Sequence, residues 1–156
     1  MPRKVGFAII GCGNIGPVHA AAIAAVPQAK LVAVADVVEA TAKKLGEQYN
    51  VPWFTDYRKM LEMKEVEAVC LCIPSGLRMD VAVDCAAAGK HILSEKPLEV
   101  TTQKIDRILN ATAKAGVKLG CIFQSRFADG SQLVRDALDQ GRFGKLVLGD
   151  AYIKWY

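Results

Sequence analysis

Near its start the chain reads Val5-Gly-Phe-Ala-Ile-Ile-Gly-Cys-Gly-Asn-Ile-Gly16, a short apolar run that leads directly into a turn with three glycines. The glycines form a G-x-G-x-x-G pattern, which by itself is a weak signal because glycine-rich turns are common. Here an alanine-rich segment of helical period follows, and a second apolar run ends at Asp36, 20 residues after Gly16. This order and spacing are typical of a dinucleotide-binding βαβ unit.

Each part of the turn has a physical role toward a dinucleotide. Gly11 permits the tight turn, Gly13 lets the backbone approach a diphosphate, and Gly16 allows the helix to pack closely on the strand. We expect the N–H groups of Asn14 and Ile15 to face the diphosphate at the positive end of the helix.

Asp36 is expected at the carboxyl end of the second strand, where it can accept hydrogen bonds from both hydroxyls of the adenosine ribose. The same carboxylate would repel a 2′-phosphate, so the sequence predicts NAD rather than NADP as cofactor. Two alternatives remain at this stage. The turn is a structural feature unrelated to the aspartate, or the acid serves another adenosine cofactor such as FAD or S-adenosylmethionine.

Short β-branched runs alternate with longer stretches of helical period along the chain. We expect strands at residues 5–10, 31–35, 51–55, 68–73, 91–94 and 117–123. We expect helices at residues 15–26, 40–49, 57–63, 78–88, 101–115 and 131–138. Because the strands are apolar on both faces and joined by helical crossovers, the fold class predicted is α/β, a doubly wound, mostly parallel Rossmann sheet with helices on both faces.

The last part of the chain differs from the rest. Apolar and polar residues partly alternate in Asp150-Ala-Tyr-Ile-Lys-Trp-Tyr156, which favours a half-exposed strand within the run 146–156. We therefore expect residues 1–124 to form the NAD-binding domain. Residues 125–156 would be a connecting helix and the first strand of a second, α+β substrate domain that is otherwise missing from the sequence.

Composition, charge and cysteine content exclude several classes of protein. The 156 residues are 52% hydrophobic and 23% charged, which suits about one globular domain and excludes disordered and fibrous classes. The net charge of +4 comes from scattered residues, so we expect no nucleic-acid partner, and no apolar run is long enough to span a membrane. The five cysteines contain no C-x-x-C pair, which predicts no disulfide framework and no metal site and favours the cytoplasm.

A second candidate site lies at the end of the fifth expected strand, in Ser94-Glu-Lys-Pro97. Polar groups at the carboxyl end of a central parallel strand face the ligand crevice. There Lys96, beside Glu95 and partly desolvated, can polarise or protonate a substrate oxygen. The alternative is an ordinary surface charge pair before a proline turn. For His19 a position at the cofactor's edge and a packed or solvent-facing position remain open, whereas His91 is interpreted as structural.

Several motifs occur in a fixed order: the glycine turn, Ala35-Asp36, Cys72-Ile-Pro-Ser75, Gly89-Lys-His91, Glu95-Lys-Pro97, Gln124-Ser-Arg-Phe127 and Gly144-Lys145. Together they resemble the glucose–fructose oxidoreductase/inositol dehydrogenase (Gfo/Idh/MocA) family over essentially the whole chain. Within that family, Ile153-Lys-Trp-Tyr156 adds a resemblance to enzymes that oxidise the 3-position of UDP-N-acetylglucosaminuronic acid.

The resemblance implies an NAD-dependent oxidoreductase that transfers hydride between NAD and a hydroxyl carbon of a sugar, nucleotide sugar or cyclitol. It implies that the adenosine half of NAD is held by Gly11, Gly13, Asn14, Ile15, Gly16 and Asp36. The diphosphate and ribose would pass Ile73, Pro74 and Ser75. The nicotinamide side would be approached by Glu95, Lys96, Gln124 and Arg126, with Lys96 as the catalytic residue.

The sequence departs from the family at one position and leaves one alternative. Many relatives have a histidine where this chain has Arg78, so no contact is assigned to that residue. Without the second domain we expect NAD binding but no turnover, and the full-length protein is expected to form a homo-oligomer. The alternative is a stand-alone dinucleotide-binding or redox-sensing module, which would need a stable end near Phe143.

Overall fold

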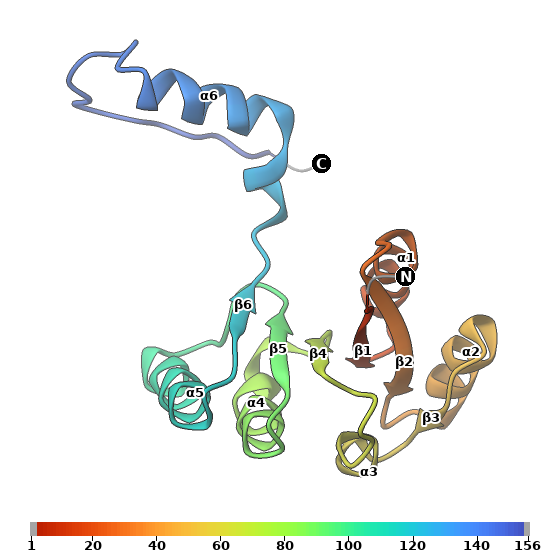
Figure 1. Ribbon diagram of the computed structural model, residues 1–156. Helices are drawn as coiled ribbons and strands as arrows, with labels where there is room; N and C mark the ends of the chain where they lie inside the picture. Colours follow the sequence, from red (N-terminus) through yellow and green to blue (C-terminus); the bar gives the residue numbers. More distant parts are fainter. Residues whose placement is uncertain (1–2, 155–156) are drawn as a thin grey trace. The chain divides into compact units, whose positions relative to one another are not determined.

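The computed structural model of the chain describes residues 3–154. The chain divides into two compact units, with the division between Ile122 and Phe123. The first unit contains one six-stranded sheet with the order β3-β2-β1-β4-β5-β6 (Figure 1). All of its strand pairs are parallel. The strands are β1 Val5–Ile10, β2 Ala29–Ala35, β3 Trp53–Phe54, β4 Ala68–Leu71, β5 His91–Ser94 and β6 Leu119–Cys121.

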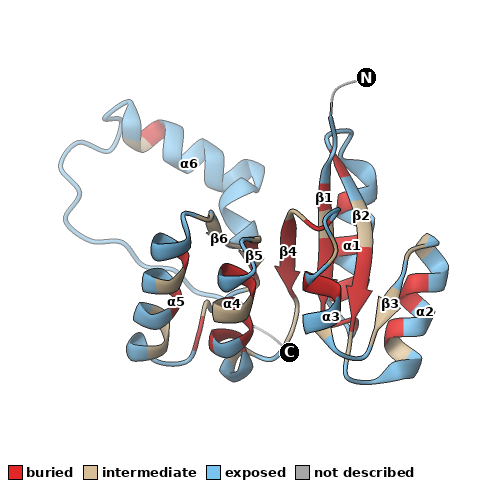
Figure 2. Cartoon of the chain, turned by 60° about the horizontal axis from the view of Figure 1, so that its bottom comes forward, coloured by how far each residue is buried: buried red, intermediate tan, exposed pale blue. Residues whose placement is uncertain are grey.

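Helices cover both faces of this sheet, as the sequence predicts. They are α1 Gly16–Ala25, α2 Glu39–Tyr49, α3 Tyr57–Leu61, α4 Arg78–Ala87 and α5 Thr102–Ala115, with a 3₁₀ turn at Ser75–Leu77. Neighbouring residues of β1 point to opposite faces, so Ile9 packs with α1 and α2, whereas Ala8 and Ile10 pack with α3, α4 and α5. The central strands are accordingly buried from both sides (Figure 2).

The termini of α5 follow from local sequence. Thr101 caps the amino end, its hydroxyl accepting from the N–H of Lys104 at 3.4 Å, and Gly116 ends the helix with a left-handed φ of 66°. Three strands are shorter than the apolar runs suggest: β3 covers residues 53–54 instead of 51–55, β4 covers 68–71 instead of 68–73, and β6 covers 119–121 instead of 117–123. Ile10 pairs with Leu71, which pairs with Ser94, and the strands stop at this common level because the chain then turns into loops.

The second unit contains a 3₁₀ turn at Gln124–Phe127 and the helix α6, Asp129–Asp139. An i,i+4 ion pair of 2.8 Å joins Arg135 to Asp139 on α6. The expectation of a strand over 146–156 is wrong for residues 146–154, which form none; residues 155–156 lie outside the described part. Side-chain alternation predicts faces, but a strand also needs backbone partners, and here Val147 is 90% exposed.

Within residues 3–154, no helix combines the length and the hydropathy that crossing a membrane requires.

Candidate functional site

The carboxyl ends of four strands form one edge of the sheet. The strand registers align Ala35 with Ile10, Ile10 with Leu71, and Leu71 with Ser94. The loops that follow these strands therefore begin side by side. The chain winds outward from β1 in one direction to β2 and β3, and in the other from β4 to β5 and β6. In open parallel sheets, ligands bind at this reversal, which here lies between β1 and β4.

The glycine turn is fixed by contacts that exclude a side chain at two of its positions. Gly11 has φ of 97°, and its N–H donates to the carbonyl of Ala35 at 2.8 Å. A Cβ on Gly11 would lie 2.6 Å from the carbonyl oxygen of Cys72, and a Cβ on Gly16 would lie 2.4 Å from that of Gly11. The absence of these carbons lets the start of α1 and the β4 loop approach the turn.

Gly13 differs from Gly11 and Gly16, because no contact within the described chain requires a glycine there. A Cβ there would meet no atom within 4 Å, so no neighbour in the described chain excludes a side chain. Gly13, Asn14 and Ile15 are exposed, and no oxygen within residues 3–154 accepts from their N–H groups. The helix behind them has Pro17 in its first turn and no capping side chain. These open amides at the positive end of α1 fit a diphosphate.

Asp36 connects the end of β2 to the glycine turn. Its Oδ2 accepts from the N–H of Cys12 at 2.7 Å, and its Oδ1 accepts from the N–H of Val38 at 2.8 Å. Each carboxylate oxygen keeps a further lone pair for a ribose hydroxyl. Burial, followed by the charge of Asp36, raises the pKa of Cys12 to about 12, so this thiol stays protonated and packs as an apolar side chain.

Glu95 and His19 form a pair that the sequence did not reveal. A hydrogen bond of 2.9 Å joins His19 Nε2 to Glu95 Oε1, and the two side chains are only 8% and 13% exposed. The other carboxylate oxygen of Glu95 accepts from the N–H of Lys96 at 3.2 Å. Lys96 itself is exposed, and its Nζ has no hydrogen-bond or ion-pair partner among the described residues.

Arg78 is a buried residue of this edge to which the sequence analysis assigns no contact. It is only 5% exposed, and its guanidinium donates to the backbone carbonyls of Ile73, Glu95 and Pro97. A signal was present in the sequence: Arg78 shares one face of α4 with the buried residues Ala82 and Cys85, four and seven positions later. An arginine at a core-facing position has to find acceptors inside the protein.

The structure places the remaining predicted residues in two groups. Ile73, Pro74 and Ser75 follow β4 at the same edge as the glycine turn, and the Ile73 side chain would lie 3.0 Å from a Cβ on Gly11. Gln124 and Arg126 belong to the 3₁₀ turn of the second unit and are exposed. His91 accepts from the N–H of Lys118 through Nδ1 at 3.1 Å, a structural contact between β5 and the start of β6.

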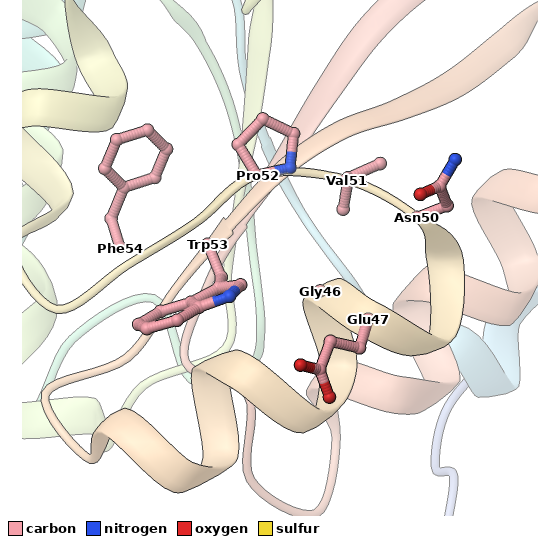
Figure 3. A pocket seen from close by; sticks show the side chains of 7 residues that line it. All are labelled: Gly46, Glu47, Asn50, Val51, Pro52, Trp53 and Phe54. Atoms are coloured by element: carbon pink, nitrogen blue, oxygen red, sulfur yellow. The ribbon is translucent and has the colours of Figure 1, made fainter.

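A separate hollow lies between the end of α2 and β3 (Figure 3). It is lined by Gly46, Glu47, Asn50, Val51, Pro52, Trp53 and Phe54. Residues 50–52 of this lining form the loop before β3. The hollow therefore lies on the amino-terminal side of that strand, whereas the glycine turn follows the carboxyl end of β1. Among residues 3–154, no cluster of three or more His, Cys, Asp or Glu side chains has the geometry of a metal site.

Comparison with known proteins gives consistent matches. Residues 5–123 match the model of a family described as an oxidoreductase family with an NAD-binding Rossmann fold, Gfo/Idh/MocA. Myo-inositol 2-dehydrogenase of Thermotoga maritima is 32% identical over 88% of this chain and 41% of its own. Inositol 2-dehydrogenase of Rhizobium meliloti is 33% identical over 91% of this chain and 43% of its own.

Solved structures agree. The WlbA dehydrogenase of Bordetella pertussis, in complex with NADH and UDP-GlcNAcA, has a TM-score of 0.87 and 35% identity over 91% of this chain and 44% of its own. The scyllo-inositol dehydrogenase of Lactobacillus casei, with bound NAD(H) and scyllo-inositol, has a TM-score of 0.85 and 30% identity over 91% and 43%. This chain spans less than half the length of these relatives.

Proposed function

Because the chain belongs to the Gfo/Idh/MocA oxidoreductase family, whose NAD-binding Rossmann domain it contains, we propose that it serves an NAD-dependent dehydrogenase of sugars, nucleotide sugars or cyclitols. The cofactor is NAD. The substrate class rests on the relatives, which include inositol dehydrogenases and a dehydrogenase with bound UDP-GlcNAcA. Because this chain covers less than half of those proteins, we expect residues 1–156 to bind NAD without turning over substrate.

One observation supports the proposal: amides at the start of α1 that have no acceptor among residues 3–154 lie one strand away from a carboxylate at the end of β2. The N–H groups of Asn14 and Ile15 would bind the diphosphate, and Asp36 would bind the adenosine ribose. With the adenosine over β2 and the diphosphate at β1, the nicotinamide half would extend the other way, over β4 and β5. That direction leads past Ile73 toward Glu95 and Lys96.

The chemistry divides between cofactor and chain. NAD supplies the hydride acceptor, and the protein supplies orientation and a path for the proton. Lys96 is proposed as the group that polarises the substrate hydroxyl or takes its proton, because it is exposed at the edge where the nicotinamide would lie and its Nζ has no partner among residues 3–154. Glu95 is already engaged with His19 and is proposed to orient this loop. Ser75, Gln124 and Arg126 are proposed cofactor contacts.

Two further features belong to the proposal. We propose that the NAD-binding domain ends near residue 124, two residues past the end of the first compact unit at Ile122, and that residues 125–156 lead into a substrate domain. The five cysteines are free thiols, which suits a reducing compartment, and we propose that the protein is cytoplasmic.

Calorimetry with NAD, NADP and S-adenosylmethionine tests the proposal. We expect NAD to bind more tightly than the other two, because Asp36 repels the 2′-phosphate of NADP and S-adenosylmethionine has no diphosphate for the amides of α1. Absorbance at 340 nm with scyllo-inositol or UDP-GlcNAcA should show no NADH formation by these 156 residues. Tighter binding of either competing cofactor would overturn the cofactor geometry, and detectable turnover would overturn the expected inactivity.

A further inference from the structure

A single buried side chain joins two loops of the site. Arg78 Nε donates to the carbonyl of Ile73 at 3.1 Å, and its Nη1 donates to the carbonyls of Glu95, at 2.9 Å, and Pro97. The first carbonyl belongs to the loop after β4, and the other two belong to the loop after β5. The guanidinium therefore fixes these loops relative to each other.

A residue that only filled space at this position would not need to be an arginine. Among the described residues no carboxylate lies within ion-pair distance of Arg78, so its charge is buried against backbone carbonyls alone. Burying a charge without a counterion is unfavourable, and an apolar side chain would fill the same space at lower cost. Such a residue is explained if the position of the three carbonyls matters.

The segment held by Arg78 is fixed on both sides of Lys96. The carbonyl before it, that of Glu95, also accepts from the hydroxyl of the fully buried Ser94 at 3.1 Å. The Glu95 side chain is held by His19 and by the N–H of Lys96. The carbonyl after Lys96, that of Pro97, is held by Arg78. The backbone around Lys96 is thus fixed while its side chain stays exposed.

We propose that Arg78 is a positioning residue for the nicotinamide half of the cofactor. It would set the backbone of Glu95–Pro97 and the adjoining wall at Ile73, and so determine where Lys96 stands. This inference rests on the proposed function, in which the nicotinamide lies over β4 and β5. Within the described chain Arg78 makes no hydrogen bond to the glycine turn or to Asp36, so the adenosine half should not depend on it.

The test compares NADH with ADP, which shares the adenosine and the diphosphate but lacks the nicotinamide and its ribose. Arg78→Met keeps an unbranched side chain that reaches about as far as Nε and removes every donor. Arg78→Lys keeps the charge but replaces the planar fork by a point charge. Arg58→Met is the matched control, because Arg58 is an exposed arginine that pairs with Asp84 on the helix layer. Thermal unfolding of each variant shows which of them fold.

If Arg78→Met leaves the loop correctly placed about one tenth of the time, the Kd for NADH rises about tenfold. The Kd for ADP should change by less than about twofold, Arg78→Lys should be intermediate, and Arg58→Met should match the wild type. The enhancement of NADH fluorescence on binding should also fall in Arg78→Met, since it reports on the nicotinamide.

The outcomes separate the two claims. Equal losses for NADH and ADP in a folded Arg78 variant, or no loss for either, would overturn the positioning role and leave NAD binding standing. A wild-type protein that binds neither ligand would overturn the proposed function and this inference together. If Arg78→Met does not fold, the ratio of the two affinities in Arg78→Lys decides in the same way.

Discussion

The two halves of the proposed dinucleotide site are built by different means. At the adenosine half, the turn closes because Gly11 and Gly16 lack a Cβ, and backbone N–H groups supply the donors. At the nicotinamide half, side chains from three separate elements, His19, Ser94 and Arg78, converge on Glu95. Cofactor binding at the adenosine half should therefore weaken when a side-chain atom is added to the turn. Binding at the nicotinamide half should weaken when a polar side-chain atom is removed.

The largest effect is expected from Gly16→Ala. The new Cβ would lie 2.4 Å from the carbonyl oxygen of Gly11, so the turn must shift. We expect the free energy of unfolding to fall by about 1–3 kcal/mol. Calorimetry should also show NAD affinity reduced by about 100-fold, since misplaced amides lose the charge-assisted bonds to the diphosphate.

Gly13→Ala is the matched control for stability, because the Cβ that it adds would meet no atom of the described chain within 4 Å. Its stability in urea should stay within about 0.5 kcal/mol of the wild type, as for surface substitutions generally. NAD binding should still weaken, because the added methyl group occupies the side that the diphosphate approaches. Wild-type affinity in Gly16→Ala would show that the turn does not hold the cofactor.

Asp36→Asn should have the next largest effect. The amide keeps one acceptor oxygen, so it cannot accept from both Cys12 N–H and Val38 N–H and also bind two ribose hydroxyls. Hydrogen bonds to a charged group contribute about 1.5–3 kcal/mol, so NAD affinity should fall by about 10- to 100-fold. The ratio of the NAD and NADP dissociation constants should also narrow; an unchanged ratio would remove Asp36 from the ribose site.

These two halves also differ in what the sequence could predict. The glycine turn and Asp36 were predictable because their geometry depends on a local motif and a strand-end position. The bond from Cys12 N–H to Asp36 was not, since a backbone donor carries no residue signature. His19 and Glu95 are 76 positions apart, and nothing in their local sequence pairs them.

The same reasoning explains the remaining differences. The sequence analysis assigns Arg78 no contact because many relatives have a histidine at this position. Its partners could not be predicted either, because they are backbone carbonyls, which every residue type possesses. The alternation in residues 150–156 indicated which side chains share a face, but it could not show whether a neighbouring strand was present. Doubly wound topology was predictable because both-face burial and helical crossovers leave a distinct pattern.

A smaller effect concerns pH. A cysteine in the unfolded chain ionises with a pKa of 9.0, whereas burial, and then the charge of Asp84, raises the pKa of Cys85 in the folded protein to about 12. Between these values the folded state keeps a proton that the unfolded state has lost, so stability falls as the pH rises above about 9. Urea unfolding at pH 8 and pH 10 should show a loss about 1 kcal/mol smaller in Cys85→Ala than in the wild type. Equal losses would contradict the raised pKa.

The smallest effect should come from His19→Gln, which weakens the hold on Glu95. One hydrogen bond contributes about 0.5–1.5 kcal/mol, so NADH affinity should fall by about three-fold. His91→Gln is the control, because His91 accepts from Lys118 N–H between β5 and β6, away from Glu95. Fluorescence titration should separate them; the same loss in both variants would mean that His19 acts through stability alone.

A crystal structure of this chain with NAD tests the placement of the cofactor most directly. We predict the diphosphate within hydrogen-bond distance of the N–H groups of Asn14 and Ile15, the adenosine ribose on the Asp36 carboxylate, and the nicotinamide beside Lys96. A diphosphate bound elsewhere, such as in the hollow lined by Gly46 and Trp53, or a ribose that does not contact Asp36, would contradict it.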